Sequence, residues 1–134
     1  MSATPQWFDQ ISPFFEDTVE RGTVTEICSV LSNERRQFII LYLLDKNEPW
    51  VRTAEISRWI AAIEQDVSIE QATGPPYHRV RTSLMQNHLD TLSRQGIIKY
   101  DSDRNQFKQG PMFGSAAQVL LHLCLMSAIF ENGL

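Results

Sequence analysis

The sequence has few of the features that mark enzymes, metalloproteins and disulfide-rich proteins. Its two cysteines, Cys28 and Cys124, lie far apart and form no CxxC pair, which is too few for a disulfide scaffold and fits a reducing compartment. The histidines His78, His88 and His122 have no cysteine or carboxylate partners at metal-ligand spacing. No GxSxG, no HExxH and no phosphate-binding glycine loop occurs. We therefore expect no catalytic residues, no metal and no cofactor.

Long hydrophobic runs are also missing from the sequence. The most apolar run, Ala116 to Phe130, is about 15 residues long and includes Gln118 and His122, so it falls short of the ~20 residues that span a bilayer. The first twenty residues are aromatic and acidic and lack the basic segment of a secretory signal. The sequence predicts a cytoplasmic protein without membrane contact.

Basic charge is scarce overall but is concentrated in one segment. The 134 residues suit one domain, and their net charge of −4 excludes a protein coated with basic residues. The segment 77–108 carries six basic residues against three acidic ones, a balance of +3, so the remainder carries −7. A positive segment on an acidic chain indicates a face directed at a polyanion.

The centre of this segment predicts a long helix over about 77–95. Leu84, Met85, Leu89 and Leu92 fall on one arc of a regular helix, with Val80 at its edge. The opposite arc carries polar side chains of the types that contact bases and phosphates, with Arg favouring guanine and Asn or Gln favouring adenine. Its residues are Arg79, Thr82, Ser83, Gln86, Asn87 and Asp90. A solvated face of an ordinary amphipathic helix would have the same pattern, and the local charge favours the nucleic-acid interpretation.

Two further residues of this helix lie on the apolar arc. His88 is predicted to be a partly buried, hydrogen-bonded core residue. Arg81 is expected either to snorkel outward or to brace the fold, and Arg79 is preferred over it as a DNA contact. Gly96 then supplies a left-handed stop. A hairpin over 97–108 follows, with a polar turn at 101–105 and with Arg104 and Lys108 placed to contact phosphate.

The preceding residues predict the remaining core elements. Ser32 is expected to cap a very apolar helix over 33–45, whose Arg35 and Arg36 are either solvated, paired or directed at a phosphate. Residues 50–52 are expected to add a strand to the hairpin, and Thr53 to cap a helix whose inward residues are Ile56, Trp59, Ile60 and Ile63. A connector over 65–76 leads to Pro76, in the first turn of the next helix.

Apolar side chains are prominent at both ends of the chain. A short helix over 24–31 should direct Ile27, Val30 and Leu31 inward. In front of it, the aromatic segment 7–15, interrupted by Pro13, is expected to cover the domain or a second subunit, with a ligand pocket as the alternative. Ser115 is expected to cap a last helix whose apolar residues surround most of its circumference. Because one domain cannot easily cover so much apolar surface, we expect a homodimer through this helix, with a possible N-terminal contribution.

These elements predict a mainly α fold with a small β-hairpin wing, a winged helix-turn-helix with N- and C-terminal helices. The expected division is an aromatic helical extension at 1–23, the winged helix-turn-helix at 24–110 and a dimerisation helix at 111–134.

Residues 31–107 also resemble a family of small winged-helix proteins found mostly in halophilic archaea and catalogued as a domain of unknown function. The resemblance rests on LSNERRQFIILYLL, EISRWIAAIEQDVSIEQAT and HRVRTSLMQNHLDTLSRQGIIKYDSDRNQF. It implies a transcriptional-regulator-like protein in which the long connector between the second and third helices is a shared feature. In a salt-rich cell the Debye length shrinks to ~3 Å, so specificity would depend on close hydrogen bonds and on DNA shape.

Three hypotheses follow from the sequence. The first is a dimeric, sequence-specific regulator that binds double-stranded DNA through Arg79, Thr82, Ser83, Gln86 and Asn87, with Arg104 and Lys108 on the backbone. The second is a protein-interaction module that acts as an adaptor or as an antagonist of a transcription factor. The third is a small-molecule pocket lined by the N-terminal aromatics that switches DNA affinity.

Overall fold

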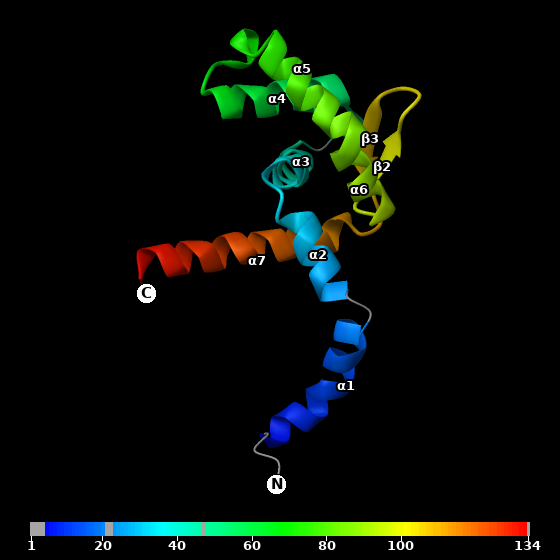
Figure 1. Cartoon of the computed structure of the whole chain (residues 1–134), viewed down its shortest axis with the longest axis vertical. Helices are drawn as coiled ribbons and strands as arrows, with labels where there is room; N and C mark the ends of the chain where they lie inside the picture. Colours follow the sequence, from blue (N-terminus) through cyan, green and yellow to red (C-terminus); the bar gives the residue numbers. More distant parts are fainter. Residues whose placement is uncertain (1–4, 21–22, 47, 134) are drawn as a thin grey trace.

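The computed structural model describes residues 5–20, 23–46 and 48–133, with side chains omitted at 14–20, 23 and 24. The chain is mainly helical and has one small antiparallel sheet (Figure 1). The side chains of Phe14 and Phe15, which belong to the aromatic segment 7–15, lie outside the described part.

The core is built from α2 (Thr23–Leu31), α3 (Glu34–Asp45), α4 (Thr53–Gln65) and a helical stretch that runs from Pro75 to Arg94. The helix α3 is nearly fully buried on the side of Ile39, Ile40 and Leu43, as its apolar sequence predicts. It begins one residue later than expected. Asn33, not Ser32, is its N-cap, because the Asn33 side-chain oxygen accepts hydrogen bonds from the backbone N–H groups of Arg35 and Arg36.

The sheet has the strand order β1-β3-β2, formed by Val51–Arg52, Gln106–Gln109 and Ile98–Asp101. Its central strand places Phe107 between Val51 and Tyr100, so a fully buried ring anchors the sheet on the helices. The predicted hairpin and the predicted third strand are therefore both present. The turn between the hairpin strands holds α4 as well, because the Thr53 N–H donates to the Asn105 carbonyl at 2.9 Å.

Two further helix starts differ from the sequence prediction. Thr53 is the first residue of α4 rather than its cap, and its buried hydroxyl has no hydrogen-bond partner within the described chain. The last helix, α7 (Phe113–Asn132), begins before Ser115, since Phe113 is drawn into the core. In the connector a short 3-10 turn, η1 (Ile69–Gln71), precedes the next helix, which begins at Pro75. Pro76 lies in its first turn, as expected.

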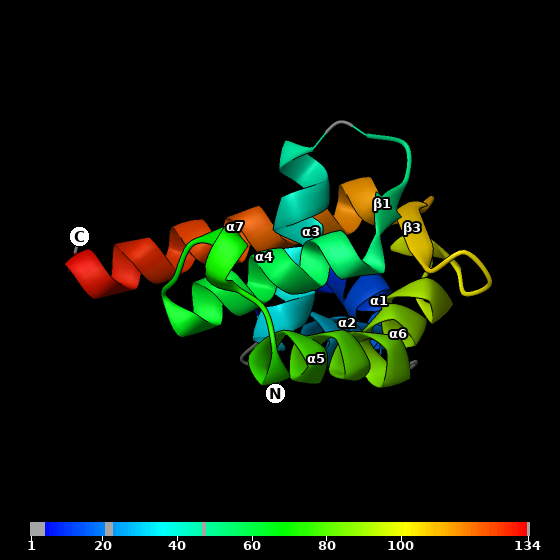
Figure 2. The same ribbon diagram turned by 90° about the horizontal axis from the view of Figure 1, so that it is seen from above.

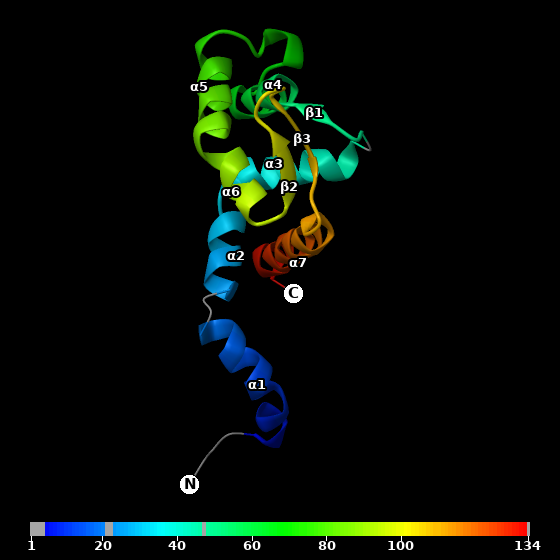
Figure 3. The same cartoon turned by 90° about the vertical axis from the view of Figure 1, so that its right-hand side faces the viewer.

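The terminal helices leave much apolar surface exposed. Figures 1 and 3 show α1 (Gln6–Glu20) standing away from α3, α4 and the sheet, with α2 as its nearest neighbour. Trp7 is 60 % exposed, so the expectation that the N-terminal aromatics cover the domain is wrong for the side chains that are described. Ile27 and Ile63, expected to point inward, are also exposed.

The helix α7 packs against α3 only through its first two turns. Phe113, Ala116, Ala117 and Leu120 are buried there, and the helix then projects from the body (Figure 2). The apolar run of about 15 residues is part of a 20-residue helix. In the described chain it alone is long and apolar enough to cross a membrane by length and composition, with a mean hydropathy of 1.7.

Candidate nucleic-acid interface

The helical stretch from Pro75 to Arg94 contains a π-helical turn, which regular periodicity did not predict. It comprises α5 (Pro75–Ser83), the π-turn η2 (Leu84–His88) and α6 (Leu89–Arg94). The Leu89 N–H donates to the Leu84 carbonyl, five residues back. A π-turn holds one extra residue, so it rotates the part that follows by roughly 100° relative to a regular helix.

This rotation decides which side chains are buried. With the extra residue absorbed, the members of one face are Val80, Leu84, His88, Leu89 and Leu92, and all five are buried. On a regular helix these five residues would spread over roughly 180°, whereas with the extra residue absorbed they lie within roughly 100°. The prediction that Met85 points inward is wrong, because the π-turn leaves its side chain 37 % exposed. The dispersed positions of these apolar residues were the one signal in the sequence that indicated a bulge.

The polar face opposite is free of the rest of the described chain. Arg79, Thr82, Gln86 and Asn87 are exposed, and Ser83 is half-buried between them. Together with His78 they line a shallow depression. Neither α1 nor α7 lies over this face (Figures 1 and 3). Within the described residues Arg79 makes no ion pair, while Asn87 accepts a long hydrogen bond from the Thr91 hydroxyl at 3.4 Å.

The two arginines at the start of α3 are engaged within the protein, so the interpretation that they reach a phosphate is not supported. Arg35 forms two hydrogen bonds with the Glu64 carboxylate, at 2.8 and 2.9 Å, and so joins α3 to α4. The Arg36 Nε–H donates to the His88 ring nitrogen Nδ1 at 3.1 Å. Its NH1 group reaches the carbonyls of Ser29 and Val30 at 3.4 Å each.

His88 is a core residue, as its place on the apolar arc predicts. Burial lowers the pKa of its imidazole to about 4, and the neighbouring positive charge of Arg36 acts in the same direction. The ring is therefore neutral near pH 7 and can accept the Arg36 hydrogen bond. Arg81 is half-buried, and its Nε has no hydrogen-bond partner within the described residues.

The hairpin lies beside the end of the 75–94 helix, where β2 contacts α6 (Figure 1). Arg104, in its turn, is 78 % exposed and lies 4.0 Å from the Asp101 carboxylate. The Lys108 ammonium lies 4.7 Å from the ring centroid of Trp50, which directly precedes β1. Lys99 faces Lys108 across the hairpin, so two positive charges lie side by side on one face of the sheet. The sequence did not single out Lys99, and only the strand register shows this pairing.

The fold and the polar face together define a mainly helical domain with a three-stranded antiparallel sheet and an exposed, bulged helix. The chain belongs to the family defined by a domain of unknown function (DUF7344), whose model matches residues 28–108. No curated protein and no solved structure matches the chain. Over the described residues, no group of three His, Cys, Asp or Glu side chains is placed to hold a metal ion.

Proposed function

We propose that the protein is a dimeric, sequence-specific DNA-binding transcriptional regulator with a winged helix-turn-helix fold. The observation that carries the proposal is the polar face of the 75–94 helix, on which Arg79, Thr82, Gln86 and Asn87 are all exposed and uncovered by the described chain. A major groove about 12 Å wide admits one α-helix with its side chains.

In the proposed complex the exposed side chains contact base edges. Arg79 is suited to guanine, and Gln86 and Asn87 are suited to adenine, since each presents paired hydrogen-bonding groups. Thr82 and Ser83 form hydrogen bonds with base edges, and the methyl group of Thr82 contacts a thymine methyl group. The π-turn supports this assignment, because it buries His88 and Leu89 and leaves Gln86 and Asn87 on the solvent side.

The hairpin acts as the wing in this proposal. The side chains of Arg104 and Lys108 contact phosphates, and Arg104 is well placed for this because it projects from the turn with only a long contact to Asp101. Their contribution is independent of base sequence and depends on salt.

The dimer forms through α7, whose exposed residues include Leu121, Leu123, Leu125, Met126 and Phe130. A two-fold dimer presents two such helices to two half-sites. The regulator is proposed to act in the cytoplasm of a salt-rich cell, and it requires no cofactor, metal or catalytic residue.

The alternative is a protein-interaction module that binds a transcription factor or part of the transcription machinery. The −7 balance outside residues 77–108 favours it. This alternative predicts a stoichiometric protein complex without bound DNA at the salt concentration of the cell.

The proposal is tested by gel retardation of the protein's own promoter fragment. The wild-type protein is compared with the double variant Arg79→Ala/Asn87→Ala. We expect retardation to be abolished while the circular dichroism spectrum is unchanged, because both side chains are exposed. Lys46→Ala is the charge-matched control. It removes one exposed positive charge at the far end of α3 from α5 (Figure 2) and should retain binding. Unchanged retardation by the double variant contradicts the assignment of this face.

A further inference from the structure

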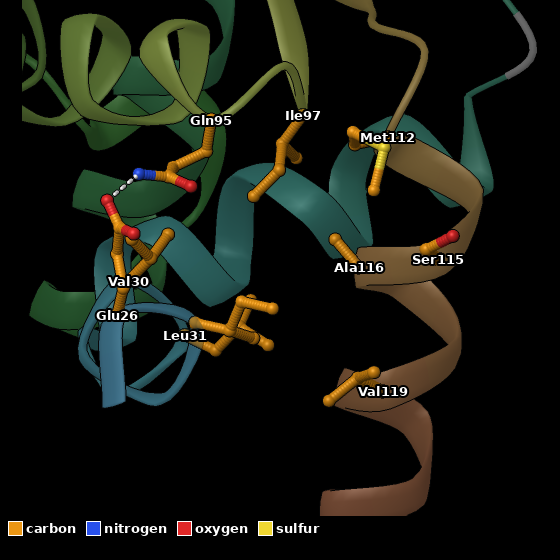
Figure 4. A pocket seen from close by; sticks show the side chains of 10 residues that line it. Glu26, Val30, Leu31, Gln95, Ile97, Met112, Ser115, Ala116 and Val119 are labelled. Carbon is orange, nitrogen blue, oxygen red and sulfur yellow. Dashed lines mark hydrogen bonds between the residues drawn. The ribbon is translucent and has the colours of Figure 1, made fainter. Parts of the chain in front are cut away.

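An apolar cavity of about 210 Å³ lies between α2, the segment that joins α6 to β2, and the first turns of α7 (Figure 4). The polar rim is a 2.6 Å hydrogen bond from the Gln95 amide to the Glu26 carboxylate. The other lining side chains are mainly apolar, among them Ile27, Val30, Leu31, Ile97, Met112 and Val119. None of the described N-terminal aromatics is among its lining residues, so the cavity is not the pocket that the third sequence hypothesis envisaged.

The α7 side of this cavity continues along the helix as an exposed stripe. Val119 lines the cavity, and Leu123, Met126 and Phe130 follow it at spacings of four, three and four residues. At about 100° per residue these four side chains lie within roughly 60° of one another, which is the heptad seam of a helix pair. All four are exposed, and Phe130 is the most exposed large apolar residue described, at 80 %.

We propose that this stripe pairs with the same stripe of a second copy in antiparallel orientation, and that Phe130 of each copy fills the cavity beside Val119 of the other. In an antiparallel pair each seam position faces its complement, so Val119 lies opposite the partner's Phe130, and Leu123 lies opposite the partner's Met126. In the same register the partner's Val119 lies opposite Phe130, so the two cavities are filled in the same way. The interface is therefore isologous, as a two-fold axis requires.

The size and position of the cavity support this occupant. A cavity of ~150 Å³ is large enough for benzene, so 210 Å³ accommodates a phenyl side chain. The cavity opens on the same side of α7 as the stripe, beside Met112 and Val119, which are themselves exposed. No residue between Lys108 and Glu131 carries a formal charge, so the paired helices bring no like charges together.

The inference deepens the dimeric part of the proposed function and does not depend on DNA binding. The cavity also adjoins the helix that carries the proposed contact face, because Gln95 on the cavity rim directly follows α6. Filling the cavity from the partner would fix α2 against the end of the 75–94 helix.

Disulfide cross-linking of the full chain tests the pairing. In a Cys28→Ser/Cys124→Ser background, Val119→Cys/Phe130→Cys should give a covalent dimer on mild oxidation. The two positions are roughly 16 Å apart along one helix, well beyond the ~7 Å limit for a disulfide within one chain. Each single variant should remain uncross-linked. The control pair Val119→Cys/Leu125→Cys should not cross-link either, because Leu125 lies on another side of α7.

The dimer dissociation constant, measured by sedimentation equilibrium on the wild-type chain and its alanine variants, gives a second test. Phe130→Ala should raise the dimer dissociation constant by about 30-fold or more, because truncation of a central aromatic anchor costs roughly 2 kcal/mol or more. Leu125→Ala should change it less than about threefold. Phe130 is exposed in the single chain, so its truncation leaves the fold intact and the comparison remains interpretable.

Several outcomes would overturn the pairing. Cross-linking of the single Val119→Cys variant would indicate parallel helices. A monomeric wild-type chain that floats with phosphatidylcholine/phosphatidylglycerol vesicles would assign α7 to lipid. Equal binding of an apolar fluorescent dye by wild type and Phe130→Ala would show that the cavity stays open for a small molecule. All these measurements are made without DNA, so failure of DNA binding by the wild-type protein leaves them valid.

Discussion

The Arg36 Nε–H donates to His88 Nδ1 over 3.1 Å, and this contact joins the first turn of α3 to the π-turn of the 75–94 helix. A protonated His88 would lose its acceptor nitrogen and would face the Arg36 charge in a buried position. The contact therefore couples the stability of the proposed contact helix to pH.

His88 should make stability depend on pH in the acidic range. Its pKa is about 4 in the folded protein and near 6.5 when unfolded, so the unfolded chain binds more protons between these values. Its contribution to the free energy of unfolding is fully present above pH 6.5 and is lost as pH falls toward 4, by up to about 3 kcal/mol. Urea denaturation of wild type and His88→Gln between pH 7 and pH 4 measures the difference.

The glutamine variant should show a flatter pH profile over this range, because its amide does not titrate. His122 is exposed on α7, and His122→Gln is the matched control with a profile like that of the wild type. Parallel profiles for wild type and His88→Gln would contradict the coupling.

The π-turn should tolerate the loss of one residue. Deletion of Met85 converts the bulge into regular helix and leaves Val80, Leu84, His88, Leu89 and Leu92 on one face. We expect the free energy of unfolding to change by less than about 1 kcal/mol, since Met85 is exposed. Deletion of Asp90, also exposed, rotates Leu92 out of the core and should cost about 2–5 kcal/mol. Chemical denaturation compares the two.

The same deletion separates fold from proposed function. Without Met85, Gln86 and Asn87 turn by roughly 50° about the helix axis while the buried face is kept, so a stable Met85 deletion should bind its promoter more weakly than the wild type. Equal destabilisation by the two deletions would show that the bulge is not what aligns the buried face.

Gly110 should be intolerant of a side chain. A Cβ there would lie 2.4 Å from the Gly96 carbonyl oxygen, where β3 leaves the sheet and its Gly110 N–H donates to Ile97. Gly110→Ala should destabilise the protein by about 1–3 kcal/mol, because backbone must move. Gly114, in α7, has nothing within 4 Å of its Cβ position, and Gly114→Ala should stabilise by about 0.5–1 kcal/mol. Thermal unfolding of both variants should therefore give shifts of opposite sign.

If the proposed DNA complex forms, its two groups of contacts should respond differently to salt and sequence. Arg79→Ala should cost about 1–3 kcal/mol and relax preference at one base pair. Arg104→Ala should weaken all sequences alike and reduce the slope of log K against log salt by about one. Binding titrations on a panel of operator variants at several salt concentrations separate the two. A loss of sequence preference in Arg104→Ala would reverse the assigned roles.

The sequence by itself determined the elements and most of the core. The apolar periodicity of α3 and α4, the stop at Gly96 with its φ of +72°, and the alternation in the hairpin are local signals, because each depends on residues close together in the chain. For the same reason the sequence placed Arg79, Gln86 and Asn87 on one polar face. The sequence determined the first residues of the helices less well, as at Asn33 and Phe113, because other residues able to cap a helix lie one or two positions away.

Only the tertiary structure decided the phase of the 75–94 helix and the partners of its neighbours. The π-turn forms because it buries His88 and Leu89 together with Val80, Leu84 and Leu92, and that benefit exists only once α3 and α4 are packed against them. Arg36 is 52 residues from His88, and Glu26 is 69 residues from Gln95, so neither contact leaves a local pattern in the sequence. Periodicity shows which side of a single helix or strand is apolar, whereas these contacts depend on where segments distant in the sequence meet.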